Sequence, residues 1–306
     1  FPYGPFHGTR VKEEVYLPDW SSRERLDYTV RVARILAQLL PPGVPGSVST
    51  VPLGYRDRMD EPEKLCLALH NIATAAEEFG RIDRETGRRL TLALEPEPDC
   101  ALARTEDAVR FFRGPIAEAL ARQSAEAAGH LGVCLDFAHC AVEFEEPRQA
   151  LAKLANAGVP VAKCHLSAAL ACRGSEESLR KLREFGDEVY LHQTKVRGAN
   201  GTITEYPDLP AALETHSPDP GDEWRVHFHV PLFWRGDRAL HGTAPFLEPL
   251  LEDGTVAART ANLEIETYTF GVMPKGLAPD SVTSAVAGEF RWVLDRLRGL
   301  SPRQPS

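Results

Sequence analysis

The chain has 306 residues, of which 43% are hydrophobic, and its formal net charge is -9. This length suits one large domain or two small ones. The acidic balance argues against a nucleic-acid partner, whose phosphates a protein without a basic patch repels. No apolar run reaches the roughly 18–20 residues of a membrane span, so no direct membrane insertion is expected. Six cysteines without a Cys-x-x-Cys pair favour reduced thiols in a cytoplasmic protein.

Helical and strand-like patterns alternate along the chain. Segment 1–7 reads as the tail of a strand, and Ser21 or Ser22 is expected to cap the helix that follows. Helices are expected at 21–40, 61–80 (with a pattern that continues towards Arg89), 105–128, 147–157, 176–185, 209–215, 244–251 and 280–300. Strands are expected at 47–53, 91–98 (where prolines stop the strand), 131–136, 159–166, 224–233 and 261–270. The last helix is predicted to face the core with Val282, Val286, Phe290, Val293, Leu294 and Leu297.

This alternation predicts a parallel sheet covered by helices. Six strands with a missing front end fit a (β/α)8 TIM barrel, which needs eight strands. An open doubly wound sheet is the alternative, but no Gly-x-Gly-x-x-Gly loop follows any strand. We therefore expect residues 1–306 to form a single barrel domain with an insertion at about 167–223.

Carboxylate and imidazole side chains stand at the ends of the predicted strands. In a parallel barrel all these ends lie on one face, so the side chains can converge. Taken singly, each could be a loop residue, a helix cap or a hydrogen-bonded core histidine. Together they predict a site for a divalent metal, with Mn, Fe, Co or Zn favoured over Ca. The candidate ligands are Glu95, Asp136, His139, His165, His227, His229 and Glu266.

Residues two apart on a strand face the same way, which places further groups beneath the ligands. Arg225 would lie below His227, and Glu264 below Glu266. Their strands are consecutive and therefore neighbours in a barrel, so an Arg225–Glu264 ion pair is predicted beneath the metal layer, because an unpaired buried charge costs several kcal/mol.

Lys163 takes the same position below His165. Two interpretations remain open: a catalytic acid or electrostatic stabiliser, or a buried lysine paired with an interior carboxylate.

The segment between His165 and Trp224 is nearly 60 residues long, whereas a barrel crossover needs about a dozen or more. Within it, 189–194 is expected to form an extra strand or a lid over the mouth. His192 and Gln193 would then face the pocket and contact substrate. The alternative is that the segment packs outside the barrel.

The candidate ligands stand in motifs that resemble those of the xylose isomerase-like TIM-barrel superfamily. The motifs are Leu94-Glu95-Pro96, Asp136-Phe137-Ala138-His139, His165 and Ile265-Glu266-Thr267-Tyr268. The resemblance implies that two Glu, an Asp and a His bind one metal, and that Glu95 and Glu266 act as acid and base. His227-x-His229 is similar to the Asp-x-His that holds a further zinc in the endonuclease IV branch, with His in place of Asp. No His stands near Pro52-Leu53-Gly54, where a multi-zinc site would want one.

A resemblance to the metabolite traffic protein EboE family covers nearly the whole chain. It rests on Phe1-Pro2-Tyr3-Gly4, Val15-Tyr16-Leu17-Pro18-Asp19-Trp20, Leu191-His192-Gln193 and His227-Phe228-His229-Val230-Pro231. It implies a barrel that lacks about its first two βα units here. It also implies a role with secondary-metabolite precursors and partners encoded in the same operon.

Three functions follow from these expectations. The first is a metal-dependent isomerase or epimerase of a small hydroxy-carbonyl metabolite, in which a carboxylate moves a proton. The second is a non-catalytic module that binds a metabolite in the same pocket. The third, a metal-dependent phosphoesterase acting on DNA, is disfavoured by the acidic charge and the missing His.

Overall fold

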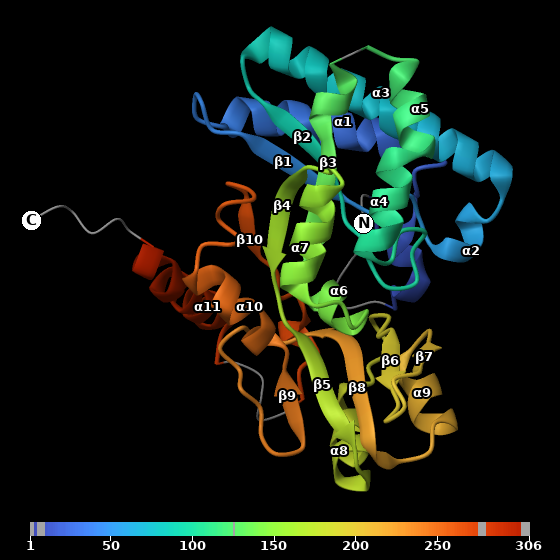
Figure 1. Ribbon diagram of the computed structural model, residues 1–306, viewed down its shortest axis with the longest axis vertical. Coiled ribbons are helices and arrows are strands. Elements are labelled where there is room, and N and C mark those ends of the chain that lie inside the picture. The colour runs from blue at the N-terminus through green and yellow to red at the C-terminus, as the bar shows by residue number, and fades with distance from the viewer. Residues whose placement is uncertain (1–2, 5–9, 125, 275–279, 301–306) are drawn as a thin grey trace, which may run out of the picture.

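The computed structural model describes residues 3–4, 10–124, 126–274 and 280–300, and it contains two five-stranded sheets (Figure 1). The first sheet is parallel and curls into a half-barrel, so the chain has an α/β fold with part of a TIM-like barrel. Its order is β1 (Gly46–Thr50), β2 (Leu90–Leu94), β3 (Leu131–Asp136), β4 (Val161–Leu166) and β10 (Leu263–Ile265). Among the described residues, β1 and β10 each have one neighbouring strand.

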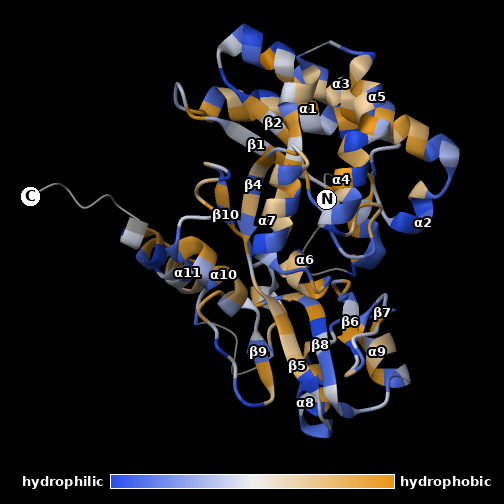
Figure 2. Ribbon diagram, in the orientation of Figure 1, coloured by the Kyte–Doolittle hydropathy of each residue, from blue (hydrophilic) through white to orange (hydrophobic). Residues whose placement is uncertain are grey.

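Helices cover the outer side of this half-barrel, as the alternation of patterns predicts. They include α1 (Arg23–Leu39), α3 (Pro62–Thr86), α7 (Pro147–Asn156), α10 (Ala244–Glu252) and α11 (Val282–Leu297). Apolar and polar residues alternate in colour along α1 and α3 in Figure 2, as expected for helices with one buried face. No helix in the described ranges is both long enough and apolar enough to cross a membrane.

Local signals mark several helix ends. The Ser22 side chain accepts a hydrogen bond from the Glu24 amide and caps α1, as predicted. Gly87, in the left-handed region at φ 66°, ends α3 at Thr86. The single helix expected at 105–128 is wrong. Pro115 lacks an amide hydrogen, and the chain forms α4 (Thr105–Arg113), α5 (Pro115–Ala121) and a 3-10 turn (Ala127–His130) instead.

The second sheet is antiparallel and lies below the first in Figure 1. Its order is β7 (Ile203–Tyr206), β6 (Thr194–Arg197), β8 (Asp219–His229), β5 (Ala169–Gly174) and β9 (Leu240–Gly242). Only two residues separate β5 from β4, so the chain leaves the half-barrel at once and pairs with β8. The expected insertion therefore contains most of a second sheet.

This sheet corrects the expected place of 224–233. We predicted a barrel strand next to 261–270, but β8 pairs with β5 and β6. β10 pairs directly with β4, with Leu263 opposite Cys164. The apolar pattern of a single strand does not specify which strands become its neighbours.

The terminal helix buries only part of the predicted stripe. Val293 is buried as predicted, but Val282, Phe290 and Leu294 are exposed, and Trp292, which was not predicted to face inward, is buried. Glu289 is fully buried as well, because its carboxylate accepts hydrogen bonds from the Leu232 amide and the Thr267 hydroxyl. The predicted strand tail at 1–7 falls mainly outside the described residues. All six cysteines are free.

Candidate metal centre

Four predicted ligands meet at the carboxyl end of the half-barrel, and we call them the carboxylate site. Glu95 follows β2, Asp136 ends β3, His165 lies on β4 and Glu266 follows β10; one ligand atom from each lies within 4.8 Å of the others. His165 Nδ1 is 2.9 Å from Glu95 Oε1 and 2.9 Å from Glu266 Oε2. The structure thus brings together the set expected to hold one metal.

Negative charge is in excess at the carboxylate site, where three carboxylates surround one imidazole. Burial alone would lower the pKa of His165, but Glu95 and Glu266 raise it well above its usual range. Burial would raise the pKa of Glu266, but His165 and His229 hold it well below its usual range. Asp136 is oriented by the His139 amide at 2.7 Å and by the Ser167 hydroxyl at 2.8 Å. A divalent cation would neutralise this charge, so the donor set fits a metal.

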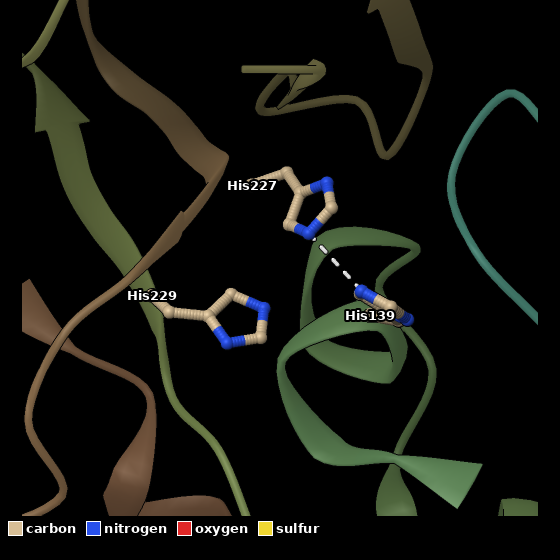
Figure 3. Close-up of side chains that lie close together, drawn as sticks. All are labelled: His139, His227 and His229. Atoms are coloured by element: carbon tan, nitrogen blue, oxygen red, sulfur yellow. Dashed lines mark hydrogen bonds between the residues drawn. The ribbon is translucent and has the colours of Figure 1, made fainter. Parts of the chain in front are cut away.

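The other three predicted ligands form a second group, the tri-His site. His139 comes from α6 (Phe137–Val142), and His227 and His229 come from β8. Figure 3 shows the three rings turned towards one another, and one nitrogen of each lies within 4.8 Å of the others. His139 Nε2 is 3.0 Å from His227 Nε2.

Carbonyl oxygens determine which nitrogen of each ring carries hydrogen. Nδ1 of His139 lies 3.0 Å from the Pro96 carbonyl oxygen. Nδ1 of His227 lies 2.7 Å from Gln193 Oε1, and Nδ1 of His229 lies 2.9 Å from the Glu266 carbonyl oxygen. A carbonyl only accepts, so each Nδ1 donates and each Nε2 presents a lone pair when its ring is neutral.

Two lone pairs at 3.0 Å repel unless a cation lies between them. Burial would lower the pKa of His139, but Asp136, Glu97 and Glu95 raise it to about 9. Burial and the neighbouring His139 hold the pKa of His227 well below its usual range. Without a metal, His139 therefore supplies the shared proton. A metal bound by three Nε2 atoms would replace that proton, and the carbonyl partners match the outer contacts of histidine ligands.

The two sites adjoin one cavity of about 210 Å³. Glu266 links them, because its carboxylate belongs to the carboxylate site and its carbonyl oxygen holds His229. The other cavity-lining residues, which are not candidate ligands, are Val11, Lys12, Val15, Tyr16, Glu97, Tyr190, Leu191 and Tyr268.

The expected contact of His192 and Gln193 with the pocket is wrong for both side chains. His192 is fully buried, with Nε2 2.6 Å from Asp187 Oδ2 and Nδ1 3.0 Å from the His227 carbonyl oxygen. Gln193 lies behind His227 and holds its Nδ1. Residues 189–193 form a loop in the pocket wall, where Tyr190 and Leu191 face the cavity instead, and Thr194 begins β6.

The predicted Arg225–Glu264 ion pair is also wrong, because β8 and β10 are not neighbours. Arg225 pairs with Glu223 at 2.7 Å and donates to the Ala141 carbonyl oxygen at 2.7 Å. Lys163 takes the place of Arg225, with its ammonium 2.5 Å from Glu264. This position matches the second interpretation of Lys163, a buried lysine paired with a carboxylate.

Sequence reasoning missed Glu97, which lines the cavity two residues after Glu95. Burial raises the pKa of Glu97 to about 7, against the opposing effect of His139. The side-chain periodicity of an extended segment was the signal available, because residues two apart face the same way.

Comparison with known proteins adds no name to this site. No protein-family model matches the chain, and no curated protein matches it. Fold and site together define an α/β protein with a half-barrel and residue groups that could hold metal ions.

Proposed function

We propose that this protein is a metal-dependent enzyme of the xylose isomerase-like class that isomerises or epimerises a small hydroxy-carbonyl metabolite. The observation that carries the proposal is the approach of Glu95 and Glu266 to one nitrogen of His165, each at 2.9 Å. Two carboxylates beside one position suit proton removal from one carbon and proton return to another. We further propose that the metabolite is a secondary-metabolite precursor, as in EboE-like proteins.

The residues of the carboxylate site would divide the work as follows. A divalent metal bound there would polarise the substrate carbonyl and make the neighbouring C–H more acidic. Glu95 and Glu266 would use one carboxylate oxygen each for the cation and the other for the proton. Asp136, fixed by the His139 amide and the Ser167 hydroxyl, would serve as a ligand without moving a proton.

One observation favours a second candidate function, hydrolysis of a phosphoester by two metals. The tri-His site offers a second metal position beside the first, and paired metals stabilise the attacking and leaving oxygens in phosphoryl transfer. The four carboxylates lining or adjoining the cavity oppose this function, because they repel a phosphate. The isomerase therefore remains our first proposal.

Metal analysis and proton exchange test these functions together. We expect the purified protein to contain divalent metal and to exchange substrate C–H for deuterium in D₂O when given a panel of hydroxy-carbonyl metabolites. Glu266→Gln should abolish exchange, whereas Glu252→Gln, the same change at an exposed position of α10, should not. Tight binding of a metabolite without exchange would instead indicate a binding module, and phosphate release from a phosphoester would indicate the hydrolase.

A further inference from the structure

Glu97 stands in the wall of the cavity but belongs to neither ligand group. The Tyr16 hydroxyl donates a hydrogen bond to Glu97 Oε1 at 2.8 Å. This contact uses one of the two carboxylate oxygens and fixes the plane of the group. Oε2 is then the oxygen available to a molecule in the cavity.

A chain of hydrogen bonds from the tri-His site holds Tyr16 in place. His227 Nδ1 donates to Gln193 Oε1 at 2.7 Å, and Gln193 Nε2 donates to the Tyr16 oxygen at 2.8 Å. Gln193 Nε2 also donates to the Pro98 carbonyl oxygen at 3.1 Å, which determines the orientation of the amide. Because the Tyr16 oxygen accepts from Gln193, its own hydrogen is directed to Glu97. Gln193 is fully buried and Tyr16 is 3% exposed, so the chain is built before any ligand arrives.

The cavity offers little to an anion. Among its described lining residues, Lys12 is the one Lys or Arg side chain. The Lys12 ammonium already binds Asp208 at 2.7 Å and the Asp187 carbonyl oxygen at 3.0 Å. A phosphate or carboxylate group would thus face Glu97 without a free Lys or Arg side chain to compensate. Val11, Val15 and Leu191 supply an apolar wall that suits the carbon face of a small molecule.

We propose that Glu97 is a specificity-determining residue that accepts a hydrogen bond from a hydroxyl group of an uncharged polyhydroxy substrate. This inference rests on the proposed function, because it assumes that other substrate oxygens bind at the metal centre. Tyr16 acts as a positioning residue that holds Glu97 at the correct angle. The pair selects for hydroxylated, unphosphorylated metabolites.

Xylitol and inorganic phosphate serve as probes for this proposal. The protein is loaded with Co²⁺, whose visible absorption reports ligands at the metal, and each probe is titrated separately. We expect xylitol to perturb the spectrum of the unaltered protein at lower concentration than phosphate does. Glu97→Gln should weaken xylitol binding by about tenfold or more at unchanged cobalt content, because the one amide oxygen accepts from Tyr16 and an NH₂ group then replaces the accepting Oε2. Tyr16→Phe should produce a smaller loss.

Glu14→Gln is the matched control, since Glu14 is exposed on the same short helical segment as Tyr16 (Lys12–Tyr16) and does not line the cavity. It should bind xylitol as the unaltered protein does. Equal xylitol affinity in Glu97→Gln and Glu14→Gln would overturn the role of Glu97. No xylitol binding, or tighter phosphate binding, by the cobalt-loaded protein would overturn the uncharged substrate class. Failure to take up cobalt would overturn the proposed function and this inference with it.

Discussion

Lys163 and Glu264 form the ion pair beneath the carboxylate site, with 2.5 Å between the ammonium and the carboxylate. Their environments differ, since the Lys163 side chain is 11% exposed and the Glu264 side chain is 56% exposed. Glu264 also approaches His165 Nε2 at 3.7 Å, so it supports a candidate ligand from below. The pair lies where we expected Arg225 and Glu264 to meet.

The unequal exposure predicts unequal costs when either partner is removed. Lys163→Met leaves a half-exposed carboxylate that water can solvate, and should lower the free energy of unfolding by at most about 1 kcal/mol. Glu264→Gln leaves a buried ammonium and should cost roughly 1–3 kcal/mol. Urea unfolding of both variants measures the difference. Equal costs, or a larger cost for Lys163→Met, would contradict this account.

Substitution of Lys195 should lower the free energy of unfolding far more than substitution of Lys163, because Lys195 is fully buried among three carboxylates. Its ammonium lies 3.2 Å from Asp99, 3.1 Å from Glu143 and 2.8 Å from Glu205. Lys195→Met should lower the free energy of unfolding by roughly 3–5 kcal/mol, since these charges lose their shared partner. The control is Lys181→Met, which breaks a partly exposed pair with Asp237 and should cost less than about 1 kcal/mol.

The tri-His site predicts a second metal that can be removed separately from the first. His229→Ala should lower the metal content by one ion per chain, as measured by elemental analysis of the purified variant. Gln193→Leu should weaken the binding of this ion by about 10–100-fold, because the ring of His227 loses its Nδ1 partner. Gln149→Leu, at an exposed position on α7, should change nothing. Unchanged stoichiometry in His229→Ala would exclude a metal at this site.

The orientation of α11 predicts which of its aromatic residues stabilises the fold. Phe290 is 52% exposed, so Phe290→Ser should change the free energy of unfolding by less than about 0.5 kcal/mol. Trp292 is 8% exposed and lies under the Arg296 guanidinium, so Trp292→Ala should cost roughly 3–5 kcal/mol. Thermal or urea unfolding distinguishes them, and the reverse order would mean that the predicted inward stripe was correct.

Asp187 should make stability depend on pH in the acid range. Burial would raise its pKa, but hydrogen bonds from His192 and from the amides of Tyr190 and Val189 lower it below the ordinary 3.8. A lowered pKa stabilises the folded chain above 3.8, and this contribution is lost as the pH falls through the folded value. Asp187→Asn should therefore be less stable at pH 7 and lose less stability between about pH 5 and 3. An identical acid profile would contradict the prediction.

The candidate ligands were predictable from sequence because strand ends are local features. An apolar run followed by Glu95, or ended by Asp136, indicates where a buried strand meets solvent, and parallel strands end on the same face. The start of α1 was predictable for the same reason, as the Ser22 cap shows. A pattern such as His227-x-His229 likewise specifies that two rings share a face.

Sequence by itself thus determined the α/β class and most of the donor residues, since these depend on periodicity over a few positions. Tertiary structure alone decided which strands are neighbours. It placed β8 in the second sheet, and it made Lys163, in place of Arg225, the partner of Glu264. It also decided how α11 is rotated and which histidines form the tri-His site. The physical reason is that strand pairing and helix packing depend on surfaces distant in the chain, and the side-chain period of one element does not identify its partner.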